Sequence, residues 1–366
     1  MRCKTPGARL PDETKNNFVE KIIFLLGNML GLTRQMPTMV GNAFVRGLSG
    51  GERKRLSIAE VMTTQSSINC WDCSTRGLDA ASALDYVRSL RIMTDVFKKT
   101  TISTLYQASS SIFNLYDKVL LLDDGYTIYF GPANEAKAYF EDIGFYCPPR
   151  KSVPDFLTGL CNPVEREIKP GFEMTAPQHA SEFQAHYVES NVHKRMMAEM
   201  AEYEQFVQRE NPSETFKEAV IAEHQKGAPK KSPYTGSFWQ QVMALTIRQY
   251  HLLIKDHHGN FSRYATIIIQ GLISASCFFK MPMDATGAFS RGGALFFALL
   301  FNSLISQTEM VNYLTGKPIL AKQKHFAMFQ PSAFYIAQVI MDVPYAIVQG
   351  KLSLFIYVSF CVLIKK

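Results

Sequence analysis

Apolar residues gather in the last third of the chain, in three long runs. Residues 264–279 read YATIIIQGLISASCFF, residues 292–308 read GGALFFALLFNSLISQT, and residues 343–364 are interrupted only by Lys351. Each run is close to the lower bound of the roughly 17 to 25 residues that cross a bilayer as a helix, and flanking Arg and Lys can lengthen a short span by snorkelling. The pattern therefore predicts membrane spans near 263–281, 292–312 and 343–364, against the alternative of three buried helices in a soluble core.

Polar residues interrupt the second apolar run. They are Asn302, Ser303, Ser306 and Gln307. Polar residues inside a span either line a substrate cavity or join neighbouring helices by hydrogen bonds. We favour the helix–helix contact.

The middle of the chain alternates strands with helices, as a parallel α/β sheet requires. Strands are expected near 67–72 and 100–107, and KVLLLDDGYTIYFG at 118–131 reads as a hairpin turning at Asp124-Gly125. The helix before the second strand has one apolar stripe, which consists of Tyr86, Leu90, Met93 and Phe97. Pro132 and Gly144 bracket a further helix.

Further helices are expected on either side of this region. Residues 17–32 have helical apolar spacing with Gly31 near their end, and residues 182–208 are expected to form one amphipathic helix. Residues 224–237 read as a linker, rich in Gly, Pro and Lys. Residues 238–258 mix apolar and basic side chains, which suits a helix lying on the cytosolic leaflet, with a soluble helix packed on the sheet as the alternative.

The stretch VRGLSGGERKRLSIAEV, residues 45–61, predicts the start of a charged helix. Ser49 suits the N-cap, Gly50 and Gly51 let another group approach the backbone, and Glu52 suits the positive end of the helix. The free N–H groups of such an end bind anions. An ordinary capped surface helix is the plain alternative for Ser-Gly-Gly alone.

The longer string from Leu48 to Arg55 resembles the signature motif of ATP-binding cassette (ABC) transporters. The motifs that accompany this signature follow in order, with a strand ending at Asp72, a loop Gly77-Leu78-Asp79, and a second strand, TTISTLYQ. The resemblance implies that Ser49, Gly50, Gly51, Glu52 and Asp79 bind nucleotide. It also implies that Asp72 holds Mg²⁺ through water, as a carboxylate at a strand end can.

Two positions depart from the ABC pattern. Cys73 stands where an acid would orient the attacking water, and Tyr106 stands at the switch histidine. The phosphate loop G-x-x-x-x-G-K-[ST] is missing from the sequence given, since Pro318 follows the nearest Gly-Lys pair. This chain is therefore not expected to bind ATP by itself in the usual way, and it has no competent catalytic residue.

This combination resembles the first nucleotide-binding domain of fungal pleiotropic-drug-resistance transporters, in the G subfamily of ABC transporters. In that family two cassettes pair head to tail, so the turn at Ser49 would serve ATP held by a second cassette. The resemblance implies ATP and Mg²⁺ as cofactors, an amphipathic small-molecule substrate, and a multi-pass location, expected in the plasma membrane with the nucleotide part in the cytosol. Six spans are expected per half, so the chain reads as a piece of a longer transporter.

The expected fold class is the C-terminal part of an α/β ABC ATPase domain, followed by three spans of an all-α transmembrane domain. The expected division has four parts: a partial nucleotide-binding domain at 1–165, a linker at 166–237, the interfacial helix at 238–258, and a partial transmembrane domain at 259–366.

Charge bears on partners and on orientation. The net charge is +7, but the basic residues are scattered or lie beside the apolar runs, and the sequence contains no nucleic-acid-binding motif. No nucleic-acid partner is therefore expected. A cytosolic loop between the second and third spans is expected to hold Lys317, Lys322 and Lys324. Lys365 and Lys366 do not fit this orientation. The formal glycosylation sequon at Asn260 lies on the same cytosolic side and should stay unmodified.

Two other function classes are open. Cys70 and Cys73 form a C-x-x-C pair that would suit a thiol redox protein, but Cys70 falls within a predicted strand and a second pair for zinc is missing from the sequence given. A membrane scaffold or pseudo-ATPase that transports nothing is the other alternative.

Overall fold

A computed structural model of the chain describes residues 2–7, 9–10, 12–41, 46–64, 66–278 and 284–362, apart from the side chains of 286, 305–306, 308–315 and 357–362. The chain divides into two compact units. Met1–Lys15 and Ile221–Lys366 form the first, and Asn16–Val220 forms the second. Residues 1–15, which sequence analysis assigned to the nucleotide-binding part, therefore fold with the C-terminal unit.

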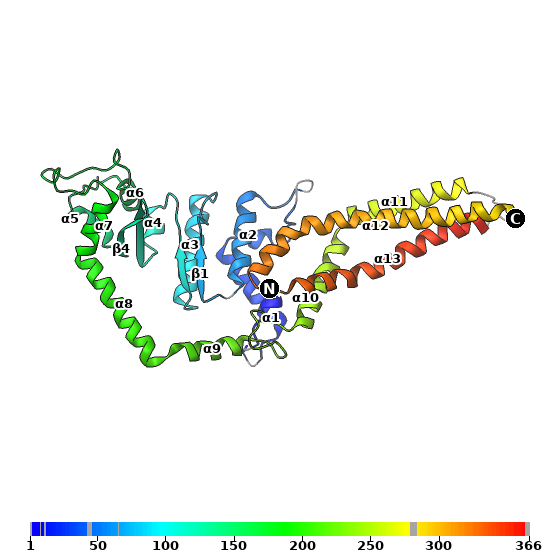
Figure 1. The fold of residues 1–366 in the computed structure, drawn as a ribbon, viewed down its shortest axis with the longest axis horizontal. Helices are drawn as coiled ribbons and strands as arrows, with labels where there is room; N and C mark the ends of the chain where they lie inside the picture. The colour runs from blue at the N-terminus through cyan, green and yellow to red at the C-terminus, as the bar shows by residue number, and fades with distance from the viewer. Residues whose placement is uncertain are drawn as a thin grey trace. The chain divides into compact units, whose positions relative to one another are not determined.

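The first half of the Asn16–Val220 unit is built around a parallel strand pair (Figure 1). The elements are α1 (Lys15–Met29), η2 (Thr33–Gln35), α2 (Gly50–Met62), β1 (Ile68–Trp71), α3 (Ala80–Asp95) and β2 (Thr100–Ser103). Ile68 pairs with Thr100 and Trp71 with Ser103, so the expected strand, helix and parallel strand are confirmed. Leu30, Ile58 and Tyr86 are buried together in the core of this half.

The second half of this unit packs helices on an antiparallel hairpin. Its elements are α4 (Ser110–Phe113), β3 (Lys118–Asp123), β4 (Tyr126–Pro132), α5 (Ala136–Asp142), α6 (Val153–Gly159), α7 (Ala180–Glu189), α8 (Asn191–Glu210) and α9 (Pro212–Glu223). Asp124 and Gly125 have φ of 46° and 82°, the left-handed pair that a tight hairpin turn needs, so the predicted turn is confirmed. Phe145 stacks on Phe183 at 5.3 Å in the core.

Three details of this unit correct the sequence analysis. Pro132 ends strand β4 opposite Lys118 and does not start a helix; a strand end tolerates Pro because no further ladder bond is lost there. Phe97 is exposed, since α3 ends at Asp95 and Lys98 turns the chain at φ 52°. Residues 182–208 are two helices, because Ser190 is extended and its hydroxyl accepts a hydrogen bond from the His193 N–H, which caps α8.

The other unit is mainly helical. Its elements are η1 (Arg2–Lys4), α10 (Phe238–Lys255), α11 (His257–Cys277), η3 (Ala285–Gly287), α12 (Ala288–His325) and α13 (Pro331–Val362). Helices α11, α12 and α13 run side by side, and α10 packs on α13 (Figure 1). Its core joins α10 to the ends of α12 and α13, through Val242, Leu245, Leu320, Met328, Phe329, Ala333 and Ala337.

The three apolar runs lie on α11, α12 and α13, although positions 279–281, 363 and 364 of the predicted spans fall outside the described residues. Within the described part of the chain, Pro331–Ile356 is long and apolar enough to cross a membrane, and Ala288–Leu304 is a shorter apolar helix. The expected loop holding Lys317, Lys322 and Lys324 is wrong, because these residues lie on α12. At 38 residues this helix is longer than the roughly 20 residues that a bilayer needs, so its basic end can extend beyond the apolar segment.

Candidate functional site

The turn before α2 is held by a reciprocal capping box. The Ser49 hydroxyl oxygen accepts a hydrogen bond from the Glu52 N–H at 3.3 Å, and the Glu52 carboxylate accepts one from the Ser49 N–H at 2.8 Å. The Gln35 side chain donates a third bond to Glu52 at 2.9 Å. Leu48 is buried just before the turn. The predicted cap is confirmed, and these bonds fix the turn without a ligand.

The capped end of α2 is open. A Cβ added at Gly50 or Gly51 would meet no atom within 4 Å, so there is room beside the backbone at both positions. The first N–H groups of a helix have no partner within it, and the cap uses only that of Glu52. The Ser49 oxygen accepts the Glu52 N–H, and its rotatable hydroxyl proton can turn from the Glu52 carboxylate to an incoming anion. The turn therefore offers donors to an incoming anion.

Glu52 and Asp79 are held as anions by hydrogen bonds. The Ser49 N–H and hydroxyl lower the pKa of the Glu52 carboxyl, with a smaller effect of Gln35. Ser82 lowers the pKa of Asp79, whose carboxylate accepts the Ser82 N–H at 3.0 Å and caps α3. A carboxylate accepts hydrogen bonds and repels phosphate, so both acids suit a role in shaping the backbone.

Two basic side chains tie α2 to the Asp79 loop and to the first turn of α3. Lys54 Nζ donates to the Arg76 carbonyl at 2.6 Å. Arg55 donates to the Ser82 hydroxyl at 3.1 Å. The structure thus brings the turn at Ser49 and the loop at Asp79 onto one connected framework. Neither contact is among the features predicted from the sequence.

At the end of β1, Thr104 links the two residues that follow the strand. Its hydroxyl donates to Asp72 Oδ1 at 2.7 Å and accepts the Cys73 N–H at 2.8 Å. Cys73 adopts a left-handed φ of 43°. Thr104 is not among the predicted site residues, although the parallel pairing of Trp71 with Ser103 puts Thr104 opposite Asp72. The carboxylate of Asp72 is therefore oriented by the neighbouring strand.

Tyr106 stands apart from this group. It follows β2, which ends at Ser103, and its side chain is 60% exposed. The predicted strand 100–107 is thus too long, since Gln107 has a φ of 51° that a strand does not accommodate.

The C-x-x-C pair has neither a metal-site nor a redox-site setting. Cys70 lies in β1 as expected, and the next helix starts only at Ala80, so neither thiol sits at a helix N-terminus. Within the residues that the structure describes, no group of three or more His, Cys, Asp or Glu side chains could hold a metal ion.

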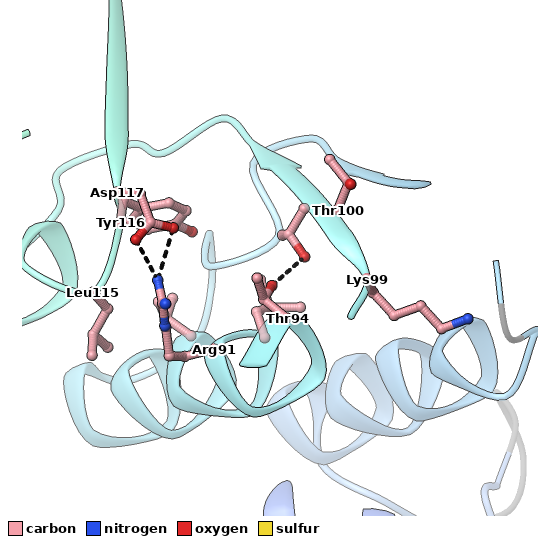
Figure 2. Close-up of a pocket in the computed structure, with 10 residues that line it drawn as sticks. Arg91, Thr94, Lys99, Thr100, Leu115, Tyr116 and Asp117 are labelled. Carbon is pink, nitrogen blue, oxygen red and sulfur yellow. Dashed lines mark hydrogen bonds and ion pairs between the residues drawn. The ribbon is translucent and has the colours of Figure 1, made fainter. Parts of the chain in front are cut away.

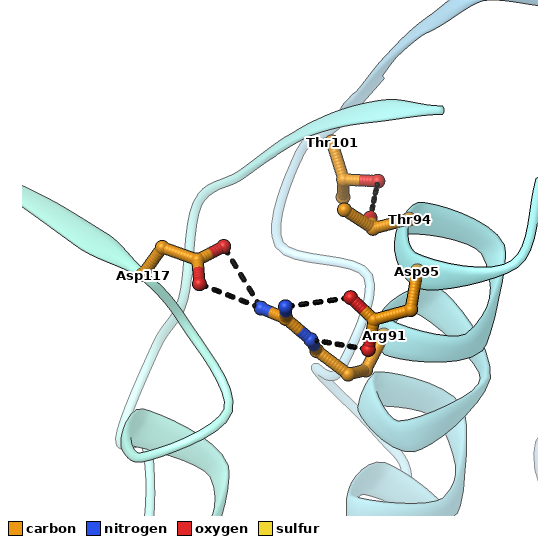
Figure 3. A network of polar contacts seen from close by, with 5 residues as sticks. All are labelled: Arg91, Thr94, Asp95, Thr101 and Asp117. Atoms are coloured by element: carbon orange, nitrogen blue, oxygen red, sulfur yellow. Dashed lines mark hydrogen bonds and ion pairs between the residues drawn. The ribbon is translucent and has the colours of Figure 1, made fainter. Parts of the chain in front are cut away.

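A cavity of about 220 Å³ lies between α3, the start of β2 and the residues just before β3 (Figure 2). Arg91 donates to both Asp117 oxygens at 2.8 Å and to both Asp95 oxygens at 2.8 and 2.6 Å (Figure 3). The hydroxyls of Thr94 and Thr101 are hydrogen-bonded at 3.2 Å. The Arg91 guanidinium is already paired with two carboxylates, so it is poorly suited to bind another anion. The cluster instead links α3 to the residue just before β3.

Comparison with protein-family models shows which proteins this sequence resembles. Residues 240–363 and 106–272 match two family models that are each described as ABC-2 type transporter. The first match covers α10 to α13 and supports a helical transmembrane domain there.

Relatives cover nearly the whole chain. ABC transporter G family member 14 of Dictyostelium discoideum is 50% identical over 95% of this chain and 24% of its own length. Member 21 of the same organism is 48% identical over 98% of this chain and 25% of its own length. The ABC multidrug transporter atrF of Aspergillus flavus is 49% identical over 88% of this chain and 21% of its own length.

The chain thus spans about a quarter of the length of these curated relatives. Identity near 50% extends through both compact units. The chain carries ABC-2 type transporter sequence and is related over nearly its whole length to transporters of the ABC G family.

Proposed function

We propose that this chain is part of an ATP-driven exporter of the pleiotropic-drug-resistance type, and that its signature turn completes an ATP site whose phosphate loop belongs to a second cassette. The multidrug transporter of Aspergillus among its relatives supports the efflux role. The observation that carries the proposal is the preformed, open turn at Ser49. ATP supplies the phosphoryl group whose hydrolysis drives transport.

In this proposal each residue of the turn has its own part. The Ser49 hydroxyl and the amides of Gly50 and Gly51 donate hydrogen bonds to the γ-phosphate. Glu52 holds the cap and makes no phosphate contact. Asp79 fixes the start of α3, so that Lys54 and Arg55 keep the adjoining loop against α2.

The chain's own nucleotide site is degenerate in this proposal. Asp72 fits a Mg²⁺ site, because its exposed carboxylate is oriented by Thr104 and keeps lone pairs for a metal-bound water. The other Mg²⁺ ligands would be water and phosphate oxygens. Cys73 and Tyr106 cannot replace the acid and the histidine that handle the attacking water in competent cassettes.

Helices α11, α12 and α13 supply three spans of the membrane domain, and α10 lies along the cytosolic leaflet of the plasma membrane. Asn302 has the role of a helix contact, since its amide donates to Ser353 at 3.1 Å and accepts from Gln349 at 3.3 Å, both on α13. The side chain of Ser306 lies outside the described residues. In this proposal the other spans lie in the rest of a longer transporter, and that whole transporter exports amphipathic small molecules.

A second candidate function is a non-transporting scaffold or pseudo-ATPase. Cys73 and Tyr106 favour it, because they remove two groups that hydrolysis uses. A transporter whose second cassette is competent accommodates the same two residues. Measured ATP turnover separates the two functions.

The test compares ATP hydrolysis by full-length transporter variants in membranes. Ser49→Arg should lower the rate by about 10² to 10³, the usual effect of losing a donor to developing charge. Cys73→Glu and Tyr106→His should change it far less, because they repair a site that does not carry the flux.

Ser152→Arg is the matched control. Ser152 caps α6 and accepts the Asp155 N–H at 3.2 Å, so this change destroys a comparable cap in the same unit. Near-normal ATP hydrolysis in Ser152→Arg, with strong loss in Ser49→Arg, is the expected result. Equal rates in Ser49→Arg and wild type would remove the proposed role of the turn.

A further inference from the structure

Each oxygen of the Glu52 carboxylate accepts a hydrogen bond from a different residue. Its Oε2 accepts the Ser49 N–H at 2.8 Å, and its Oε1 accepts the side-chain amide of Gln35 at 2.9 Å. All three residues belong to the Asn16–Val220 unit. The signature turn is therefore supported by a side chain that comes from outside the motif itself.

Gln35 is held in place by the core of the same unit. It is the last residue of η2, and its backbone N–H donates to the Leu32 carbonyl at 3.0 Å. Leu32 is buried in one core with Ile58, which lies on α2. The segment with Gln35 and the helix with Glu52 thus pack on a shared core, which keeps their side chains within reach of each other.

The orientation of the Gln35 amide follows from its partner. An ionised carboxylate only accepts hydrogen bonds, so the NH₂ group of Gln35 must face Glu52. The amide oxygen of Gln35 is buried and accepts no hydrogen bond from the residues that the structure describes. An unpaired buried acceptor costs free energy, and the bond to Glu52 offsets part of this cost.

In the proposed site, the hydroxyl proton of Ser49 has two competing acceptors, the Glu52 carboxylate and the γ-phosphate. The hydroxyl oxygen is fixed by the Glu52 N–H at 3.3 Å, but its proton can rotate toward either acceptor. Each donor to a carboxylate stabilises its charge and makes it a weaker acceptor for a further donor.

We propose that Gln35 is a positioning residue: by donating to Glu52 Oε1 it weakens the hold of Glu52 on the Ser49 hydroxyl, and so leaves that proton for the γ-phosphate. Gln35 itself makes no phosphate contact in this proposal. The inference rests on the proposed function of the turn.

The experiment measures ATP hydrolysis by the full-length transporter in membranes. Gln35→Met keeps the length of the side chain and removes the donor, so it should lower the rate about 3- to 10-fold, the effect of weakening one hydrogen bond. Gln35→Lys, which restores a donor to Glu52, should hydrolyse ATP at nearly the wild-type rate. Thr33→Val is the matched control, because it breaks the 2.8 Å bond from Thr33 to Asn28 within the same short segment and leaves Glu52 untouched.

A double variant separates competition for the proton from simple support of the turn. Gln at position 52 still forms a capping box, but it has no charge to attract the Ser49 proton. Gln35→Met combined with Glu52→Gln should therefore hydrolyse ATP faster than Gln35→Met alone. If Gln35 only supported the turn, the double variant would be no faster.

A wild-type rate in Gln35→Met, a double variant no faster than Gln35→Met, or an equal loss in Thr33→Val would overturn the inference. If Gln35→Met does not fold, Gln35→Glu decides in its place, because it turns an acceptor toward Glu52 and should also lower the rate; a wild-type rate there would overturn the inference. Unchanged hydrolysis in Ser49→Arg would instead overturn the proposed function of the turn.

Discussion

The Thr104 hydroxyl donates a hydrogen bond of 2.7 Å to the Asp72 carboxylate across the two parallel strands. The bond orients the carboxylate, and the other lone pairs of Asp72 can accept a hydrogen bond from a metal-bound water in the proposed site. Because the same hydroxyl accepts the Cys73 N–H, one side chain sets both positions after β1.

In the full-length transporter, Thr104→Val should therefore raise the Mg²⁺ concentration that nucleotide binding at this site requires. Loss of such an orienting partner typically costs about 10- to 100-fold in metal affinity. Thr104→Ser, which keeps the hydroxyl, should retain it, and Thr100→Val on the same strand is the control. Titration of Mg²⁺ against a fluorescent nucleotide measures the effect, and equal Mg²⁺ dependence in Thr104→Val and wild type would contradict it.

The capping box predicts a pH dependence at the start of α2. The folded-state pKa of Glu52 is lowered, so the cap is fully stabilising above the ordinary value of about 4.3 and weakens as pH falls through the folded-state pKa. Glu52→Gln should remove this acid-dependent part. Amide hydrogen exchange over residues 50–62, corrected for intrinsic rates, checks it; a wild-type cap that does not weaken below about pH 4 argues against an ionised Glu52.

Arg91→Met should destabilise the Asn16–Val220 unit modestly. The guanidinium is one-third exposed and pairs with two more exposed carboxylates, so solvent screening limits the cost to about 1 kcal/mol. Arg88→Met, which breaks one exposed contact of 3.5 Å with Asp85, should cost less. Thermal unfolding at low and high salt makes the comparison, and a cost that is independent of salt would show that packing, not charge, is lost.

Asn260 should carry no glycan in membrane preparations. It lies in the first turn of α11, and its amide donates to the Leu253 carbonyl of α10 at 2.6 Å. The proposed orientation puts this end of α11 in the cytosol, where N-glycans are not added. Glycosidase treatment of wild type and Asn260→Gln should give identical mobility. A glycan on Asn260 would invert the orientation and remove the transporter proposal with it.

Local signals in the sequence predicted much of the site. Ser49 with Glu52 three residues later specifies a capping box, Asp124-Gly125 specifies a hairpin, and the strand before Asp72 ends where its pattern ends. Each of these depends on residues that are close in the chain.

The remaining features depend on distant segments. Thr104 reaches Asp72 only through strand pairing, and Gln241 reaches Gln330 only through the packing of α10 against α13. The packing of residues 1–15 with 221–236 likewise cannot be predicted from hydrophobic periodicity. The sequence pattern assigns Gln225 to a polar linker, whereas its side chain is buried in the structure. The amphipathic pattern of residues 182–208 predicted one helix, but Ser190 interrupts it, because its side chain caps α8 and α7 ends before it.

The most direct test of the central claim is a structure of the full-length transporter trapped with Mg²⁺ and a non-hydrolysable ATP analogue. The γ-phosphate held by the second cassette should lie about 3 Å from the Ser49 hydroxyl and from the Gly50 or Gly51 amide, a normal hydrogen-bond distance. Glu52 should still accept the Ser49 N–H, as it does in this structure. A nucleotide-bound second cassette whose γ-phosphate makes no contact with residues 49–51 would contradict the account.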